Sequence, residues 1–436
     1  MINAVRQGFR VPELRKKLLF TGGVIILARL LSHVVVPGTD KTSLDALFSS
    51  SGVLGFLDLF SGGGLSRFSI IAMGVNPYIN ASIIMQLLTV VSDRFKEMSK
   101  DGAQGQRKIN QYTRRLTVLL ALVQSYGLII LFSNPSVHVL NSPTLFTTLT
   151  VMATLTCGTI FLMWLGEQIT EYGIGNGISI IIFAGIVGRF LPSTTSSLGT
   201  NQTGGVLIFG VLAIGVVALI VYVQQGERRI RIQSAQRIVG RTTYQGKSSV
   251  LPLKVNQAGV IPIIFAISMM ILPTMFANYF TGHAGTLGNL AAGITKYWQP
   301  TGPNPMWDII YNSTYFIVII AFTYFYTAIT FDPVDVADNL KKQAIFITGV
   351  RPGKSTALYL DHIMTRITLV GGIFLASITV LIPLVAGVLA FGQAGAKSSS
   401  LYLGGTAVLI VVGVALDTMK QLETQLLMRN YKGFLS

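Results

Sequence analysis

The stretch GVLIFGVLAIGVVALIVYVQQ, residues 205–225, decides the class of fold. It carries no charged side chain, and it is long enough to cross the ~30 Å hydrocarbon core of a bilayer as an α-helix. Polar and apolar residues do not alternate along it, as they do in the strands of a membrane barrel. The stretch is therefore predicted to be a transmembrane helix.

Similar apolar stretches recur along the whole chain. Hydrophobic residues make up 51% of the sequence and charged residues only 11%, whereas soluble domains average about 25% charged residues. The predicted fold is an all-α polytopic membrane protein with ten transmembrane helices. With residues 205–225, the predicted spans are 18–36, 71–91, 116–133, 147–166, 175–191, 256–278, 308–330, 366–390 and 401–419.

The basic residues indicate how these helices are oriented. Of the 33 Lys and Arg residues, 27 lie in or beside five segments that fall on one face of the predicted topology. Because basic residues accumulate on the cytoplasmic side of membrane proteins, these segments and both termini are predicted to be cytoplasmic. The segments are the N-terminal arm 1–17, the loop 92–115, the long loops 226–255 and 331–365, and the tail 420–436.

The chain offers little for catalysis, metal binding or ion coupling. Its four histidines are scattered, without the spacing of a metal site. Charges inside the predicted spans are few: Arg29 and Asp417, for which structural pairing or snorkelling is the favoured interpretation. The motif RPGKST, residues 351–356, lacks the glycine register of a phosphate-binding loop. A ten-span secondary transporter of a small solute and a membrane-embedded enzyme are therefore the less favoured classes, and no cofactor or metal is predicted.

Two features stay open on residues alone. Uncharged polar residues enter several spans, and they either bond neighbouring helices or mark a helix seam that can part. The two long basic loops are either a topology signal or a docking platform for an acidic partner. The polar residues in question are Asn76, Asn80, Gln86, Gln124, Asn256 and Gln257.

The stretch SGVLGFLDLFSGGGLSRFSI, residues 51–70, fits neither a span nor an exposed loop. Asp58, Arg67 and three consecutive glycines are unsuited to a membrane span. Its apolar residues are nevertheless too many for a loop in water. On residues alone, the favoured interpretation is an interfacial loop.

Six motifs, spread in order along the chain, resemble the SecY family of channel-forming subunits of bacterial protein translocases. The resemblance covers all ten predicted spans. The motifs are FSGGGLSRFSIIAMGVNPYINASIIMQLL (60–88), RKINQYTRR (107–115), WLGEQITEYGIGNGISIIIFAGIV (164–187), LPLKVNQAGVIPIIFA (251–266), FDPVDVADNLKKQAIFITGVRPG (331–353) and GGTAVLIVVGVALD (404–417).

The resemblance implies a fold and a function. Two pseudo-symmetric inverted halves, residues 18–191 with helices 1–5 and residues 192–419 with helices 6–10, would surround a central pore. The implied function is a protein-conducting channel that moves unfolded secretory proteins across the plasma membrane and releases membrane-protein helices laterally into the bilayer. Loops 226–255 and 331–365 would be cytoplasmic docking loops. Such a channel is not an enzyme and uses no cofactor.

The resemblance also assigns roles to single residues. The pore ring would be Val75, Ile79, Ile178, Ile182, Ile264 and Ile410. Residues 51–70 would be a short re-entrant plug, with Val53, Leu54, Phe56, Leu57, Asp58, Leu59, Phe60, Gly62, Gly63, Gly64 and Arg67. The lateral gate would include Asn80, Gln124 and Asn256, and Arg241 and Arg351 would take part in docking.

The implied partners are the small subunits SecE and SecG, the SecA motor ATPase, the ribosome, signal sequences, secretory polypeptides and membrane lipid, without direct DNA binding. Three positions depart from the family pattern. Val75 stands where isoleucine is common, Asn76 where an apolar residue is expected, and Thr242 where a second basic residue often follows Arg241.

Overall fold

The computed structural model describes most of the chain. The described residues are 9–37, 61–132, 144–198, 203–234, 237–239, 242–244, 248–280, 286–298, 305–390 and 404–432, with the single positions Thr39, Ser43, Leu44, Phe48 and Asp58.

Each of the ten predicted spans overlaps one long helix of the described chain. Five helical segments, in α7, α8, α13 with α14, α15 and α17, are long and apolar enough to cross a membrane by length and composition. A multi-pass helical membrane protein is thereby confirmed, and the count of ten spans stays a prediction. The long helices are α2 (Pro12–Leu31), α5 (Asn76–Val91), α7 (Gly102–Phe132), α8 (Leu145–Tyr172), α9 (Gly177–Leu198), α10 (Thr203–Gln225), α11 (Ile261–Phe280), α13 (Pro305–Thr330), α15 (Lys354–Ala390) and α17 (Gly404–Lys432).

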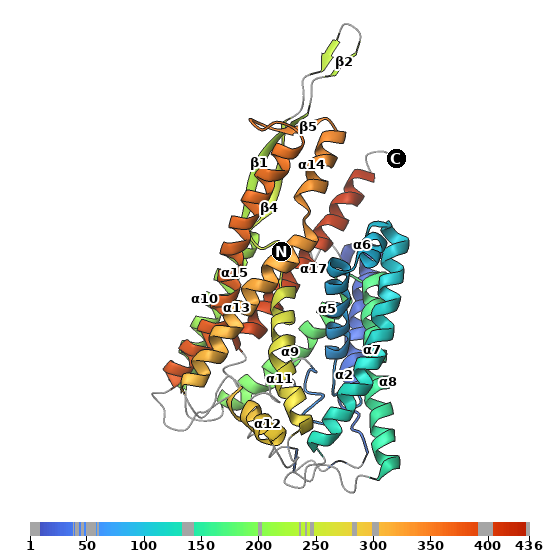
Figure 1. Ribbon diagram of the computed structural model, residues 1–436, viewed down its shortest axis with the longest axis vertical. Helices are drawn as coiled ribbons and strands as arrows, with labels where there is room; N and C mark the ends of the chain where they lie inside the picture. The colour runs from blue at the N-terminus through green and yellow to red at the C-terminus, as the bar shows by residue number, and fades with distance from the viewer. Residues whose placement is uncertain are drawn as a thin grey trace.

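The helices form two groups that meet near the middle of the molecule (Figure 1). In the first group α5 packs on α7, α7 on α8, and α8 on both α2 and α9. In the second, α11 packs on α13, α13 on α15, and α17 on both α15 and α10. Helix α11 also contacts α5 and α7, and α9 contacts α17. These contacts bring the two halves of the chain together.

Five strands lie outside the helical body, within the two long loops. Strands β4 (Ser248–Lys254), β1 (Glu227–Ser234) and β5 (Ile345–Ile347) form an antiparallel sheet in the order β4-β1-β5. In this sheet Ile232 lies opposite Ser249 on one side and Ile347 on the other. Strands β2 (Arg237–Val239) and β3 (Thr242–Tyr244) form a hairpin that projects beyond it (Figure 1). No strands were predicted in these loops.

The sheet and its neighbouring helix have a small apolar core of their own. Ile230, Ile232 and Leu253 from the sheet pack with Leu360 and Ile363 from the start of α15. Helix α14 (Pro333–Lys342) lies beside them. Asp332 caps its N-terminus, where its carboxylate accepts hydrogen bonds from the Val334 and Asp335 amides. The described residues of 226–255 and 331–365 therefore form one folded platform rather than two separate loops.

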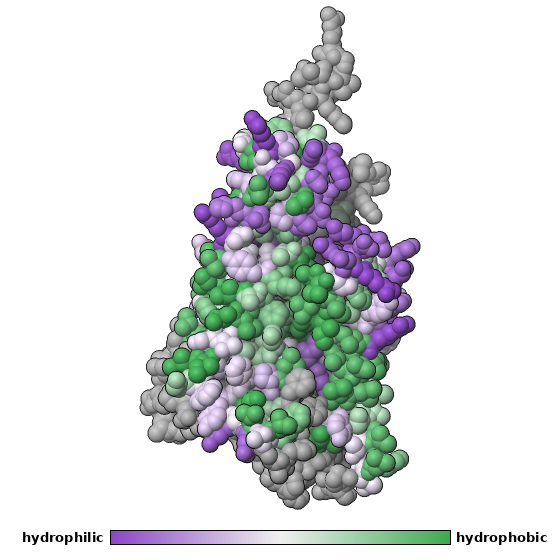
Figure 2. All heavy atoms as spheres, viewed as in Figure 1, coloured by the Kyte–Doolittle hydropathy of each residue, from purple (hydrophilic) through white to green (hydrophobic). Residues whose placement is uncertain are grey.

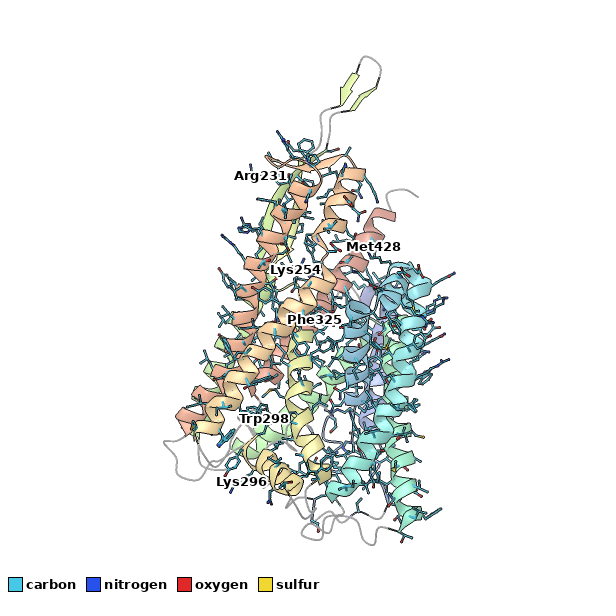
Figure 3. All side chains as sticks on the ribbon, in the orientation of Figure 1. Arg231, Lys254, Lys296, Trp298, Phe325 and Met428 are labelled. Atoms are coloured by element: carbon cyan, nitrogen blue, oxygen red, sulfur yellow. The ribbon has the colours of Figure 1, made fainter. Side chains whose placement is uncertain are left out.

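The surface of the molecule is divided by polarity. Hydrophilic side chains gather over the platform and over the neighbouring end of α6 (Asp93–Lys100) and α7, and hydrophobic side chains form a broad band next to them (Figure 2). Figure 3 places Arg231 in the platform and Lys296, on α12 (Thr286–Tyr297), at the opposite end of the molecule. A band of exposed apolar side chains between polar ends suits a protein surrounded by lipid.

Candidate functional site

Five of the six predicted ring residues lie in one apolar cluster where the two helix groups meet. Their side chains are between 1% and 6% exposed. They come from both halves of the chain: from the start of α5, from α9, from α11 and from α17. We call Val75, Ile79, Ile182, Ile264 and Ile410 the central cluster.

Ile178, the sixth predicted residue, borders the central cluster instead of lying inside it. It is partly buried and packs against the cluster from the first turn of α9. Its side chain lies over Gly166 of α8, where an added Cβ would come 2.4 Å from the Ile178 Cδ1 atom. Gly166 therefore leaves the space that this isoleucine occupies.

The central cluster can form a barrier without any chemistry of its own. Aliphatic side chains offer no hydrogen bonds to water, so a narrow constriction that they line excludes water and hinders ions. The described residues contain no group of three or more His, Cys, Asp or Glu that could hold a metal ion. The arrangement thus suits a seal that opens by moving side chains and helices.

The segment before α5 makes a tight turn around Asp58. The Asp58 carboxylate accepts hydrogen bonds from the Ser66 amide, at 2.7 Å, and from the Ser61 hydroxyl, at 3.2 Å. The Asp58 carbonyl accepts one from the Gly63 amide at 2.9 Å. Gly62 and Gly63 have φ angles of 66° and 87°, in the left-handed region that glycine occupies at little cost. Two of the three consecutive glycines therefore lie in a turn that a buried carboxylate closes.

The chain that follows this turn is buried although it is not helical. Phe68 packs edge-on against Phe132 of α7, with ring centroids 5.1 Å apart. Ser69 pairs with Val35 in a β-bridge just after α2. Non-helical backbone at membrane depth is tolerated where protein covers it. Arg67 is exposed on this segment, and the predicted plug residues Val53, Leu54, Phe56, Leu57, Leu59 and Phe60 lie outside the described residues.

A cavity of about 50 Å³ lies between this segment and helices α5, α7 and α11. Asn76, Asn80 and Gln124 line it, together with Ile264 of the central cluster. Among the described residues these three amides have no protein hydrogen-bond partner. A space of this size with several polar groups can hold water. The structure thus brings together two of the three predicted gate residues, Asn80 and Gln124, at a seam between the two halves.

Asn256, the third predicted gate residue, does not line this cavity. Its side chain is 6% exposed and lies just before α11. Its amide Nδ2 donates to the Gly259 carbonyl at 2.9 Å, and its Oδ1 atom has no partner among the described residues. Asn256 thus stabilises the turn into α11, and a role for it in the gate stays a prediction.

Arg351 lies on an exposed turn of the platform. The turn is bounded by Gly349 and Gly353, with φ angles of 86° and 99°, and Thr348 donates its amide to the Arg231 carbonyl at 3.3 Å. The motif RPGKST leads into the first turn of α15. Arg241, the other predicted docking residue, lies outside the described residues.

Comparisons with known proteins agree on one family. The SecY family model matches residues 69–419. The protein translocase subunit SecY of Streptomyces galbus is 44% identical over 452 aligned residues, with 100% of both chains covered. The same subunit of Mycobacterium bovis is 43% identical, again with 100% of both chains covered.

Solved structures have the same fold. A structure described as that of a protein conducting channel superposes with a TM-score of 0.64 at 19% sequence identity, covering 94% of this chain and 92% of that one. Sec61 in the canine ribosome-channel complex from the endoplasmic reticulum superposes with a TM-score of 0.62, also at 19% identity, over 94% of this chain and 92% of that chain.

The fold and the central cluster define a multi-pass helical membrane protein whose two halves share a buried apolar core. The match to most of the chain by one family model, and relatives above 40% identity over its full length, decide the family. The chain belongs to the SecY family.

Proposed function

We propose that this protein is the channel through which unfolded secretory polypeptides cross the plasma membrane and from which apolar helices pass sideways into lipid. The observation that carries the proposal is the central cluster. Side chains from both halves of the chain, separated by up to 335 positions between Val75 and Ile410, meet in one buried apolar group. Such a group can seal a pore at rest and yield around a chain of any sequence, because its contacts are not directional.

The cavity of about 50 Å³ at the seam supports the lateral release of helices into lipid. Asn76, Asn80 and Gln124 line the cavity where α11 approaches α5 and α7, and these amides have no protein partner among the described residues. Hydrogen bonds between membrane helices average only about 0.6 kcal/mol, and in the part of the chain that the structure describes these three amides make none. A seam held mainly by packing can part when an apolar signal sequence competes for the same contacts.

The platform supports cytoplasmic docking. It is rich in exposed basic side chains, such as Arg228, Arg231 and Arg351, and a basic surface attracts acidic partners such as RNA. The proposed partners are the ribosome and the SecA motor ATPase on this face, and the small subunits SecE and SecG within the membrane. The proposed orientation has both termini in the cytoplasm, and the energy for transport comes from the partners, since the channel performs no covalent chemistry.

The function is tested by trapping a chain in transit. A secretory precursor stalled halfway is expected to crosslink to photoreactive residues placed at Ile79 and Ile264, because both belong to the central cluster. Ile317 on α13, 64% exposed on the apolar outer surface, is the matched control and is expected not to crosslink. A stalled precursor that reaches Ile317 as readily as Ile79 and Ile264 would contradict the channel.

Replacing Asn80 with leucine is expected to make lateral release harder. Leucine fills part of the cavity of about 50 Å³ and removes an amide without a partner, and both changes stabilise the closed seam. We expect insertion of a weakly apolar test helix to fall roughly threefold to tenfold, the factor given by about 1 kcal/mol. Leucine at Ser82, on the same helix but outside the cavity, is the control. An unchanged or increased yield of inserted helix with Asn80→Leu would contradict a seam that limits release.

A further inference from the structure

Arg29 joins three parts of the molecule that are far apart in sequence. It lies in the last turn of α2, and its guanidinium donates three hydrogen bonds to backbone carbonyls. Nη1 donates to Gly62 at 2.6 Å, and Nη2 donates to Ala184 at 2.8 Å and to Gly185 at 3.0 Å. One side chain thereby connects α2, the turn around Asp58, and α9.

The surroundings of Arg29 leave room for a guanidinium. A Cβ at Gly188 would come 1.4 Å from the Arg29 Nη2 atom, so any other residue there would displace the side chain. A Cβ at Gly62 would come 2.9 Å from Nη1 and 2.9 Å from the Gly185 Cα atom. Gly62 also has a φ angle of 66°, which disfavours other residues. Glycines on both sides therefore make the three hydrogen bonds possible.

Arg29 also lies beside the central cluster. With Ser61, Gly62 and Gly185 it lines a cavity of about 30 Å³, and Val75 of the central cluster lines the same cavity. No described carboxylate lies within ion-pair distance of Arg29. The partners of its guanidinium within the described ranges are carbonyl oxygens, which suit the planar, forked donor geometry of arginine.

The three hydrogen bonds of Arg29 connect different parts of the molecule. Two of them connect α2 to α9, which both pack on α8 and belong to the same half of the chain. The third connects these helices to Gly62, in the turn around Asp58. If this turn moves during transport, the bond to Gly62 is the one that has to break.

We propose that Arg29 is a positioning residue that latches the turn at Gly62 to α9 and so holds this turn in its resting place beside Val75. This inference rests on the proposed function, because it concerns the resting state of the channel. Arg29 acts through the turn. Its charge makes the latch strong, and the single bond to Gly62 makes the latch releasable.

The latch is tested by the accessibility of a reporter cysteine. Cys157 is first replaced by alanine, and Leu65, 2% exposed and directly beyond the turn, is replaced by cysteine. In the full channel complex without precursor, Arg29→Met is expected to raise the rate at which a water-soluble maleimide modifies this cysteine by roughly tenfold. That factor corresponds to the loss of one hydrogen bond to a charged group.

Two further variants test the geometry. Gly188→Ala keeps the arginine but occupies the position of its Nη2 atom, so it is expected to raise the rate as Arg29→Met does. Arg29→Lys keeps the charge with a single donor group, so its rate is expected to lie between those of the wild type and Arg29→Met. The controls are Arg15→Met, exposed on the same helix, and Gly215→Ala, whose added Cβ meets no atom within 4 Å; both are expected to leave the rate unchanged.

A second reporter separates a latch from a merely structural role. Leu155 on α8 is 0% exposed and belongs to the same apolar cluster as Leu65. If Arg29→Met raises the modification rates of both Leu65→Cys and Leu155→Cys, the arginine supports the fold in general and the latch is wrong. An unchanged rate for Leu65→Cys also overturns it. Neither maleimide modification rate depends on transport, so failure of the latch is distinguishable from failure of the channel itself.

Discussion

Replacing Ile264 with asparagine is expected to make the resting channel leak ions roughly a hundredfold faster than the wild type. Ile264 is 6% exposed, belongs to the central cluster and also borders the cavity at the seam. An amide in this position keeps water hydrogen-bonded where isoleucine excludes it. Retaining such a polar contact lowers the barrier by about 3 kcal/mol, which is a factor of roughly a hundred in rate. The measurement is ion flux through purified channels in lipid vesicles without precursor.

The matched control is Ile317→Asn on α13. Ile317 is 64% exposed on the apolar surface, so the same substitution there places an amide in a membrane helix without touching the constriction. We expect its ion flux to equal that of the wild type. If Ile264→Asn channels assemble normally and stay as tight as the wild type, the central cluster is not the ion barrier and the seal lies elsewhere.

The helices could be predicted from the sequence because the bilayer imposes a length. A stretch such as residues 205–225 has to be helical to satisfy its backbone in lipid, and α10 spans Thr203–Gln225. The strands were missed because no such constraint acts outside the bilayer. The signal was present: in β1, buried Ile230 and Ile232 alternate with exposed Arg229 and Arg231. Its partner β5 has only three residues and lies more than a hundred positions away, so the pairing itself was not predictable.

The site was predictable only in part, and for a similar reason. An isoleucine in a membrane helix looks the same whether it faces lipid, a neighbour or a pore, so the resemblance alone selected the ring residues. It could not reveal that Ile178 packs over Gly166 or that Asn256 bonds to Gly259 within its own turn. Arg29 was recognised as an unusual charge, but its partners are backbone carbonyls, and carbonyls carry no sequence signal.

Replacing Arg351 with glutamate is expected to reduce SecA-driven export roughly a hundredfold while leaving the channel assembled. The Arg351 side chain is exposed, and its backbone carbonyl accepts a hydrogen bond from the Thr356 hydroxyl at 2.9 Å. An exposed arginine on a fixed turn is typical of an interface hot spot, and losing about 2.8 kcal/mol of docking energy corresponds to roughly a hundredfold. The measurement is ATP-dependent uptake of a precursor into membrane vesicles.

Arg228→Glu is the matched control, because Arg228 is an exposed arginine of the same basic platform, on β1. If charge alone attracts the motor, both reversals weaken export equally, and a specific role for Arg351 is wrong. If Arg351→Glu prevents assembly, the arginine is structural in spite of its exposure. The geometry favours a specific role, because the turn is tied to the start of α15. Gly349 and Gly353 permit its left-handed φ angles, Pro352 fixes the φ angle of the residue after Arg351, and the Thr356 hydroxyl bonds to the Arg351 carbonyl. A turn restrained in this way loses less entropy when a partner binds the guanidinium.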